Sequence, residues 1–330
     1  MAVPFVTLAD IEAARARIAG DIVATPTVDS PSLSERFGVP VRLKLEHRQT
    51  TGAFKLRGAS NAVALLSDGT RGVTAASTGN HGRALSLAAG RRGIPAVICM
   101  SRLVPENKLV EIRRLGAEAR IVGASQDEAQ VEAERLVAHE GFVMVPPFDD
   151  PAIVAGQGTL GLEIVEQTPD VETVLIQVSG GGLASGVAAA VKALRPNARI
   201  VGISMARGAA MKASLDAGRP VDVEEERTLA DSLGGGIGLE NRLTFAMCRD
   251  LLDDLVLLTE TEIAAGIRHA YAEEREVVEG AGAVGIAALL AGKVKARGPT
   301  VAVLSGGNVD MNLHRDIVSG AWRDGRERAA

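Results

Sequence analysis

The chain has 330 residues, enough for two α/β lobes with separate cores, and its 46% hydrophobic content is ordinary for a globular protein. A formal net charge of −5 and an aromatic content of 2% provide neither a broad basic surface nor base-stacking platforms, so nucleic acid and anionic membranes are not expected as partners. Cys99 and Cys248 form no CxxC pair, which argues against a disulfide framework and a zinc site. We find no signal-peptide pattern and no apolar run approaching the ~18 residues of a membrane span, and therefore expect a cytoplasmic protein.

The first half of the chain alternates strand-like and helix-like segments. An amphipathic helix is predicted at 8–19, with Thr7 as its N-cap. Strands are then predicted at 41–45, 72–76, 96–100, 118–122 and 143–145, and helices at 54–66, 83–92, 106–115 and 125–139. This rhythm is typical of βαβ units on a parallel sheet.

The alternation restarts after Pro146 and Pro147. Helices are predicted at 157–166, 183–194, 260–274 and 283–290, and strands at 173–178, 199–204 and 300–304. The segment 217–241 is charged and then rich in glycine, which predicts a long functional loop. We therefore predict an α/β fold of two parallel-sheet lobes, a small lobe at 48–147 and a large lobe formed by 1–47 and 148–330.

Three glycine-bearing segments follow predicted strands, at 77–82 (STGNHG), 179–183 (SGGGL) and 305–308 (SGGN). Such junctions place ligands at the carboxyl edge of a parallel sheet, where helices begin. Successive N–H groups in the triple glycine predict a phosphate site, although a tight turn used only for packing is the alternative.

A nucleotide-binding fold is the competing prediction, because 156–161 (GQGTLG) matches G-x-G-x-x-G. The fingerprint requires a strand directly before it and an acidic residue at the end of the next strand, and neither is present. We interpret the match as the start of a helix.

Lys55 stands between Phe54 and Leu56 at a predicted helix start. Burial and the positive end of a helix both lower the pKa of an ammonium group, which favours the nucleophilic amine that a Schiff base requires. The alternative is an ordinary solvated surface lysine.

Four ordered motifs then carry a resemblance: 51–59 (TGAFKLRGA), 77–82, 179–186 (SGGGLASG) and 304–308 (LSGGN). Together they resemble the threonine/serine dehydratase and serine racemase family of fold-type II pyridoxal-phosphate enzymes, which share a tryptophan synthase β-like fold with the active site between two lobes. The similarity spans about 18–308. Among these enzymes the chain is most similar to dehydratases of hydroxyectoine utilisation and of 3-hydroxyaspartate.

The resemblance implies a role for each matching residue. Lys55 would carry the cofactor and act as catalytic base, and Thr78 occupies the position of the second-face base of serine racemases. The ring of pyridoxal phosphate would pack on Phe54, with Asn80 bound to its 3′-oxygen and Ser305 facing its pyridine nitrogen. Its phosphate would be bound by the backbone of Ser179, Gly180, Gly181, Gly182 and Leu183. The substrate would meet Ser77, Thr78, Gly79, Asn80, His81 and Gly235. His81 is expected to shape the loop by hydrogen bonding, and assistance in catalysis is the alternative.

Several positions depart from the family pattern. Ala53 replaces a serine, and Ser204 replaces the carboxylate that binds a divalent metal in racemases, so no metal is predicted there. Ser232 replaces a glycine before the unusual glycine run at 234–238, which suggests a polar or acidic substrate side chain. The chain ends without room for the regulatory domain of biosynthetic threonine deaminases, so inhibition by isoleucine is not expected.

The resemblance predicts a lyase that dehydrates a small β-hydroxy amino acid, namely threonine, serine, 3-hydroxyaspartate or an amino acid derived from hydroxyectoine, to a 2-keto acid and ammonia. An amino-acid racemase, a β-replacement synthase and a catalytically silent binding protein are the alternatives. The secondary alcohol of Thr78 argues against the racemase. A homodimer is expected by analogy with the family alone.

Overall fold

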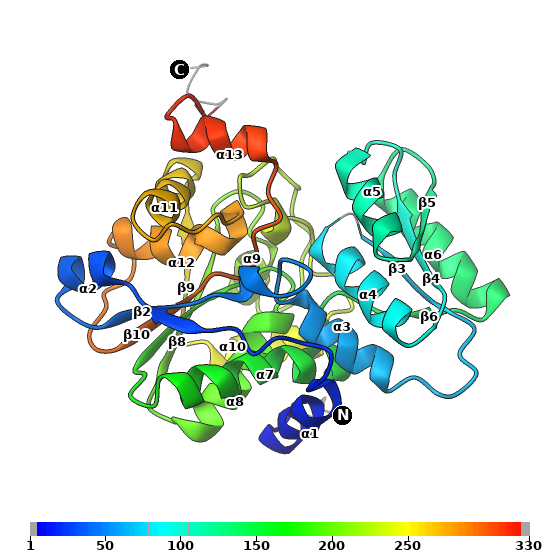
Figure 1. Ribbon diagram of the computed structural model, residues 1–330, viewed down its shortest axis with the longest axis horizontal. Helices are drawn as coiled ribbons and strands as arrows, with labels where there is room; N and C mark the ends of the chain where they lie inside the picture. The colour runs from blue at the N-terminus through cyan, green and yellow to red at the C-terminus, as the bar shows by residue number, and fades with distance from the viewer. Residues whose placement is uncertain (1–4, 78, 105, 325–330) are drawn as a thin grey trace.

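The computed structural model describes residues 5–77, 79–104 and 106–324 and contains two separate β-sheets (Figure 1). The larger sheet has six strands in the order β1-β2-β10-β7-β8-β9. In that order they are β1 (Thr27–Asp29), β2 (Val41–Lys44), β10 (Thr300–Val303), β7 (Thr173–Gln177), β8 (Arg199–Met205) and β9 (Asp254–Leu258). All neighbours are parallel except β1 and β2, so the central strands end at one common edge.

Both faces of this sheet are covered by helices. Val174 and Ile176 of β7 face a core with α7 (Pro151–Gln167) and α8 (Gly182–Leu194), while Leu175 faces a core with α11 (Glu260–Ala272) and α12 (Gly280–Leu290). Alternate side chains of a strand point to opposite faces, so an apolar run is buried on both. Each fully buried Val, Leu or Ile contributes about 1.5–3 kcal/mol to folding.

The smaller sheet lies wholly between residues 73 and 144 and is parallel throughout, in the order β5-β4-β3-β6. Its strands are β3 (Val73–Ala76), β4 (Ala96–Met100), β5 (Glu118–Ile121) and β6 (Val143–Met144). One face packs on α4 (Asn80–Arg91) and α5 (Glu106–Arg114), and the other on α6 (Gln126–Glu140). The parallel two-lobe α/β architecture is therefore confirmed, whereas the lobe boundaries at 47/48 and 147/148 stay predictions.

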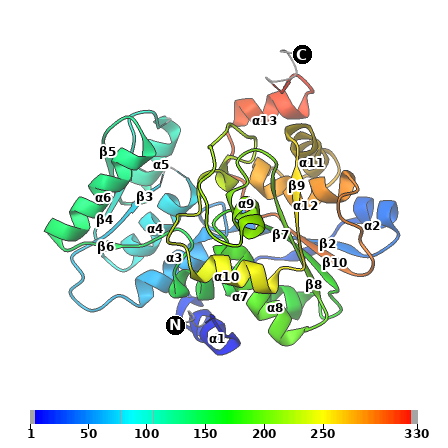
Figure 2. The ribbon, with the colours of Figure 1, turned by 180° about the vertical axis from the view of Figure 1, so that it is seen from behind.

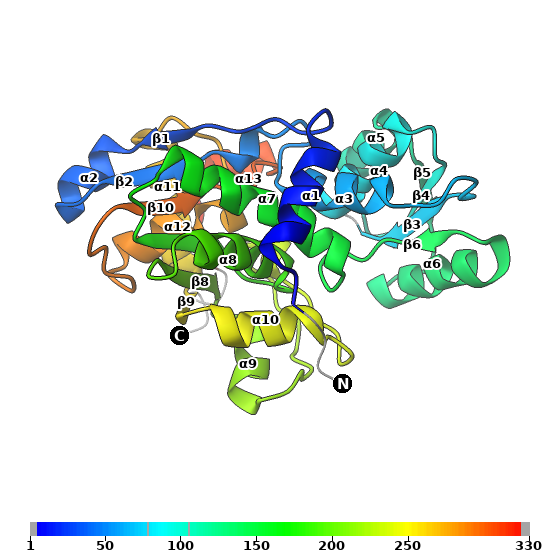
Figure 3. The same ribbon diagram turned by 90° about the horizontal axis from the view of Figure 1, so that it is seen from below.

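The remaining elements connect or cover the two sheets. They are α1 (Leu8–Ile18), α2 (Pro31–Phe37), η1 (Glu46–Arg48), α3 (Lys55–Ala64), α9 (Ala210–Ala217), η2 (Asp231–Leu233), α10 (Leu243–Leu251) and α13 (Met311–Val318). Thr7 caps α1 as predicted, in a capping box with Asp10. Seen from below, α1 lies across α7 and beside α3, at the junction of the two lobes (Figure 3). Within the part of the chain that the structure describes, no helix is both long and apolar enough to cross a bilayer.

The G-x-G-x-x-G match lies inside α7, so our interpretation of it as a helix start was wrong. The helix begins at Pro151, and the Asp150 carboxylate accepts hydrogen bonds from two N–H groups of its first turn. The glycines serve packing instead. A Cβ atom at Gly156 would lie 2.6 Å from the carbonyl oxygen of Arg57, and one at Gly161 would lie 2.9 Å from that of Val187. Their absence lets α3 and α8 approach α7 closely.

Other short elements were not predicted. The structure adds β1, α2, α9, β9, α10 and α13, and α4 begins at Asn80 instead of at 83. The long loop predicted at 217–241 is confirmed, with only the single turn η2 inside it. Most of the missed segments are short, and tertiary packing stabilises such segments more than their own propensity does.

A buried cluster of four charged side chains joins α3, α7 and the end of β2. Arg57 donates to both carboxylate oxygens of Glu46, at 2.7 and 2.8 Å, and to both of Glu163, at 2.6 and 2.9 Å. The Lys44 amine donates to Glu163 at 2.6 Å. Burial opposes ionisation of Glu46, but the charge and hydrogen bonds of Arg57 outweigh it and lower the pKa of that carboxyl group. Two positive and two negative groups therefore balance in a fully enclosed site.

We expect Glu163→Gln to destabilise the protein strongly. The neutral amide would leave Lys44 and Arg57 with Glu46 as their one carboxylate partner in the cluster, and an uncompensated buried charge costs about 3–5 kcal/mol. The free energy of unfolding is measured by urea denaturation. The matched control is Asp216→Asn, which breaks the ion pair with Lys212 at the exposed surface of α9 and should cost less than about 1 kcal/mol. Equal, small losses in the two variants would contradict the role of the cluster.

Candidate active site

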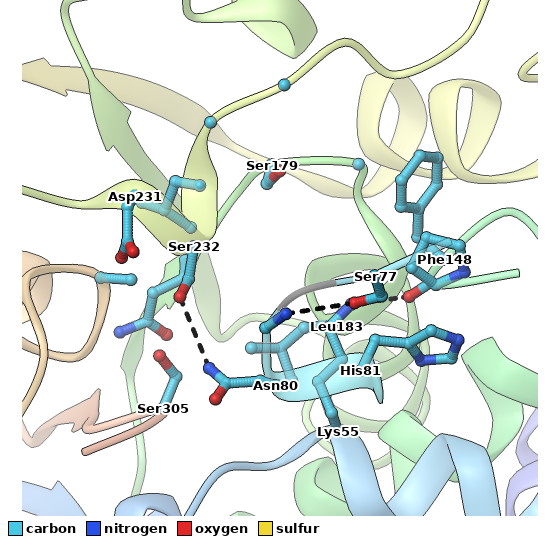
Figure 4. A pocket seen from close by; sticks show the side chains of 18 of the residues that line it. Lys55, Ser77, Asn80, His81, Phe148, Ser179, Leu183, Asp231, Ser232 and Ser305 are labelled. Carbon is cyan, nitrogen blue, oxygen red and sulfur yellow. Dashed lines mark hydrogen bonds between the residues drawn. The ribbon is translucent and has the colours of Figure 1, made fainter. Parts of the chain in front are cut away.

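A cavity of about 450 Å³ lies where the carboxyl ends of β3, β7 and β10 approach the start of α3. Every predicted site residue that the structure describes lines it, and ten of the lining side chains are labelled in Figure 4. The predicted residues concerned are Phe54, Lys55, Ser77, Gly79, Asn80, His81, Ser179, Gly180, Gly181, Gly182, Leu183, Gly235 and Ser305. Thr78 lies outside the described residues. The topology thus gathers five sequence segments into one site.

Lys55 is the first residue of α3, and its side chain enters the cavity (Figure 4). Its Nζ donates a hydrogen bond to the Pro147 carbonyl oxygen at 2.7 Å and lies 5.4 Å from the centre of the Phe54 ring. Burial lowers the pKa of the Lys55 amine to about 8. A sizeable share of the amine is therefore neutral at mildly alkaline pH, as a nucleophile or base requires.

His81 supports the loop and does not offer a proton. Its Nε2 lies 2.8 Å from the carbonyl oxygen of Val145, which can only accept, so Nε2 carries the hydrogen. Burial and the neighbouring charge of Lys55 lower the pKa of His81 to about 3, so the ring is neutral. Its Nδ1 is then an acceptor, buried and without a hydrogen-bond partner among the described residues. The predicted loop-shaping role fits these contacts.

The turn between β7 and α8 is a concave, backbone-lined surface. Gly181 has φ of 88°, a left-handed conformation that favours glycine, and its carbonyl accepts the first bond of α8 from Ser185 N–H at 2.8 Å. The ring of Phe148 occupies the space that a side chain at Gly180 would need, and a Cβ at Gly182 would lie 3.0 Å from the backbone of Phe148. N–H groups at a helix start have no partners within the helix, so this turn suits a phosphate group.

A chain of side-chain hydrogen bonds joins several residues that line the cavity. Arg83 donates to the side-chain oxygen of Asn308 at 2.9 Å, and the Asn308 amide donates to the oxygen of Asn80 at 2.7 Å. The Asn80 amide in turn donates to Glu279 at 2.9 Å and to Ser232 at 3.5 Å. The oxygen and the N–H₂ group of the Asn80 amide are both held by these bonds, and Figure 4 shows the amide directed at Ser232.

Glu279 is a buried carboxyl group within this chain. It occupies the N-cap position of α12, yet its side chain makes no capping hydrogen bond there. Burial and the nearby Asp231 raise the pKa of Glu279 to about 7, although Ser232 and Asn80 oppose the rise. Glu279 is therefore an acid at the cavity wall and not a side-chain cap of α12.

Ser305 connects the end of the large sheet to the start of α3. Its carbonyl accepts from Phe54 N–H at 3.1 Å, and Gly307 N–H donates to the Gly52 carbonyl at 2.9 Å. The Ser305 side chain is buried at the cavity wall. This pairing sets the position of Lys55 relative to Ser305.

The loop at 217–241 forms the outer wall. Gly234 and Gly235 line the cavity beside Ser232, Asp231 and Glu225. A Cβ atom at Gly235 would meet nothing within 4 Å, so the wall is open at this position.

Sequence reasoning did not identify all lining residues. It missed Arg83, Lys108, Phe148, Gln177, Glu225, Asp231 and Asn308 as contributors to the site. Asn308 ends a motif that was recognised, and Phe148 directly follows the proline pair. Their closeness to these motifs in the sequence could have identified them as lining residues. Gln177 ends β7, directly before the glycine turn. Among the described residues, no group of three or more His, Cys, Asp or Glu side chains gathers as a metal site.

Comparisons with known proteins identify a family, two relatives and a solved structure that this chain resembles. The family model described as "Pyridoxal-phosphate dependent enzyme" matches residues 18–306. A Sinorhizobium fredii protein, provisionally named a threonine dehydratase, is 66% identical over 320 residues, covering 96% of each chain. The L-threonine ammonia-lyase of Thermotoga maritima is 43% identical over 326 residues, covering 98% of this chain and 80% of that one. The solved structure of maize serine racemase superposes with a TM-score of 0.90 at 33% identity, covering 96% of this chain and 98% of that one.

We expect Glu279→Gln to remove a pH dependence of stability. A glutamate titrates near 4.5 in the unfolded chain and Glu279 near 7 in the folded one, so the folded state holds this proton more tightly. Between pH 5 and pH 8 this group therefore lowers the free energy of unfolding as pH rises, by on the order of 2 kcal/mol. Urea denaturation of both proteins at the two pH values measures the difference. An identical pH dependence in wild type and variant would contradict the assignment.

Proposed function

This chain belongs to the family of pyridoxal-phosphate-dependent enzymes, and we propose that it is an ammonia-lyase that dehydrates a small β-hydroxy amino acid to a 2-keto acid and ammonia. The observation that carries this proposal is the placement of the Lys55 amine and the glycine turn in one cavity. L-Threonine is the first substrate to test, because two of the relatives compared above are named for threonine.

The cavity fits the cofactor through named residues. We propose that Lys55 binds it covalently, that the turn at 179–183 binds its phosphate, and that Phe54 packs on its ring. Ser305 would meet the pyridine nitrogen and the oriented Asn80 amide the ring oxygen. Once bound, pyridoxal phosphate supplies an electron sink that stabilises the carbanion formed at Cα.

The protein's own groups would then position the substrate and move its proton. The start of α4, with Ser77 and Gly79, would bind the substrate carboxylate, to which backbone N–H groups and the Ser77 hydroxyl would donate. Lys55 Nζ would take the Cα proton, because burial and the neighbouring charge of Lys55 lower the pKa of His81 to about 3 and make its ring a weak base. Whenever the Lys55 amine is free, the Pro147 carbonyl holds it at the cavity edge.

The substrate side chain would point toward the loop at 217–241. Ser232 and Asp231 make that wall polar, and the glycines at 234–236 leave it open. We therefore propose that β-hydroxy amino acids with a polar extension, such as 3-hydroxyaspartate or a hydroxyectoine-derived amino acid, are accepted beside threonine and serine.

We further propose a cytoplasmic homodimer with lobes divided at 47/48 and 147/148. Both cysteines are free and buried, which is compatible with a reducing compartment. Light scattering of the purified protein measures the mass, and a monomeric mass of 34.2 kDa would contradict the dimer.

We expect Lys55→Ala to abolish activity while the protein stays folded. The variant cannot bind the cofactor covalently, so the visible absorption band of the lysine-bound cofactor should be lost and turnover should fall by at least about 10³-fold. Keto acid and ammonia are followed with L-threonine, L-serine and 3-hydroxyaspartate. The control Lys192→Ala removes a surface lysine paired with Asp253 and should behave as wild type.

Three other outcomes are informative. Inversion of the substrate α-carbon without ammonia would favour a racemase, which the likeness to maize serine racemase makes the second candidate. Turnover that requires an added nucleophile would favour β-replacement. Absence of the absorption band in cofactor-treated wild type would contradict the role of Lys55.

We expect the apoprotein to take up pyridoxal phosphate faster as pH rises through about 8. Only the neutral amine attacks the aldehyde, and burial lowers the pKa of Lys55 to about 8. The uptake rate is followed by absorbance between pH 6 and pH 10. A rate that rises only near the ordinary lysine value of about 10.4 would contradict the lowered pKa.

A further inference from the structure

Thr244 lies on the first turn of α10, on the outer side of the glycine turn. Figure 2 shows α10 in yellow, and this helix packs against α8, the helix that follows the turn. Thr244 is fully buried, and its hydroxyl oxygen lies 2.7 Å from the carbonyl oxygen of Gly180. Gly180 lines the cavity, whereas Thr244 is not among its lining residues, so the contact reaches the turn from outside the cavity lining.

The surrounding groups determine where the single Thr244 hydroxyl proton goes. The amide of Asn241 donates to this hydroxyl at 2.8 Å, so the hydroxyl is an acceptor there. The Asn241 oxygen lies 3.0 Å away and the nearer Asp149 oxygen 3.2 Å away. Both already accept backbone N–H groups at 2.8 Å, from Phe245 and Thr244 respectively. The Gly180 carbonyl is the nearest acceptor and receives the proton.

Because a peptide unit is planar, the Thr244 contact also fixes the orientation of the Gly181 N–H. The C=O of Gly180 and the N–H of Gly181 belong to one trans peptide unit and point to opposite sides. A carbonyl directed at Thr244 therefore directs the Gly181 N–H away from α10. Gly180 and Gly181 themselves line the cavity, so that N–H faces the place proposed for the phosphate.

Glycine has the freest backbone, so this peptide needs an external contact to keep one orientation. The next carbonyl, that of Gly181, is already fixed by α8, because it accepts the Ser185 N–H at 2.8 Å, whereas the Gly180 carbonyl accepts from Thr244. The Asn241–Thr244–Gly180 series also aligns its dipoles, which strengthens the Gly181 N–H as a donor.

A role for this hydroxyl in starting α10 is the competing explanation. The backbone N–H groups of Arg242 and Thr244 are bound by the Asp149 carboxylate, and that of Phe245 by the Asn241 oxygen. The helix start is thus satisfied by other side chains. The Thr244 hydroxyl is left for the glycine turn.

We propose that Thr244 is a positioning residue for the cofactor phosphate, because its hydroxyl holds the Gly180 peptide so that the Gly181 N–H faces the phosphate. This inference rests on the proposed placement of the phosphate at 179–183 and is independent of the substrate.

The experiment compares two ligands that differ by the phosphate. Apoprotein of wild type and of Thr244→Val, a substitution of similar shape without the hydroxyl, is titrated with pyridoxal phosphate and with pyridoxal. We expect the dissociation constant for pyridoxal phosphate to rise about tenfold in the variant, as the loss of one well-placed hydrogen bond predicts. That for pyridoxal should change less than about twofold. Thr244→Ser restores a hydroxyl and should recover most of the affinity.

Two control variants distinguish the role of Thr244 from the placement of the phosphate at 179–183. Thr168→Val alters a buried threonine whose hydroxyl has no hydrogen-bond partner in the described chain, and should leave both affinities unchanged. Gly181→Ala tests the premise, since a side chain there requires a left-handed residue and would crowd Cys248, Met211 and Thr244. Unchanged pyridoxal phosphate affinity in Gly181→Ala would refute the phosphate placement. A loss in Gly181→Ala with none in Thr244→Val would refute the role of Thr244 alone.

Equal losses for both ligands in Thr244→Val would also overturn the proposal, because they would indicate a general structural role. If Thr244→Val does not yield folded protein, Thr244→Ala is measured in the same way, with the same expected difference between the two ligands.

Discussion

The rest of the structure depends on one constraint, the buried pairing of Arg57 with two carboxylates. Arg57 lies two residues beyond Lys55 on α3, and its guanidinium binds Glu46 at the end of β2 and Glu163 on α7. The start of α3 is thereby attached to the large sheet and to its covering helix. An ion pair of this kind adds little net stability against an apolar replacement, but it permits few alternative arrangements because each misplaced charge would be unpaired. The reactive amine is consequently held in a defined place.

The short segment at 145–149 connects the functional loops to one another. Its carbonyls accept hydrogen bonds from His81 and Lys55, its phenylalanine ring packs on Gly180, and its first aspartate binds the start of α10 at Thr244. The segment passes between the two lobes, so a displacement of one lobe would shift the contacts of the Lys55 amine, the glycine turn and α10 together. This arrangement explains how groups from separate sheets form one site.

Local patterns were sufficient for much of the architecture. Apolar runs followed by glycine predicted β3, β7 and β10 and the loops after them, because a buried parallel strand and a ligand-binding turn each need those residues locally. The start of α7 was misplaced by six residues, since the Asp-Pro pair that caps the helix also reads as a turn. The glycines of α7 resembled a nucleotide fingerprint, and only their contacts with α3 and α8 revealed that they serve packing.

By itself, the sequence determined the fold class, and its four ordered motifs carried the resemblance to the pyridoxal-phosphate family and to the lysine and glycine turn proposed to hold the cofactor, because motifs depend on residue types at fixed spacing along the chain. The tertiary structure decided what those residues touch. It placed Pro147 at the Lys55 amine, assembled the chain from Arg83 to Glu279, and set Thr244 behind the glycine turn. These partners lie up to 228 residues apart, as Asn80 and Asn308 do, and hydrogen-bond geometry between such distant positions leaves no periodic signal in a single sequence.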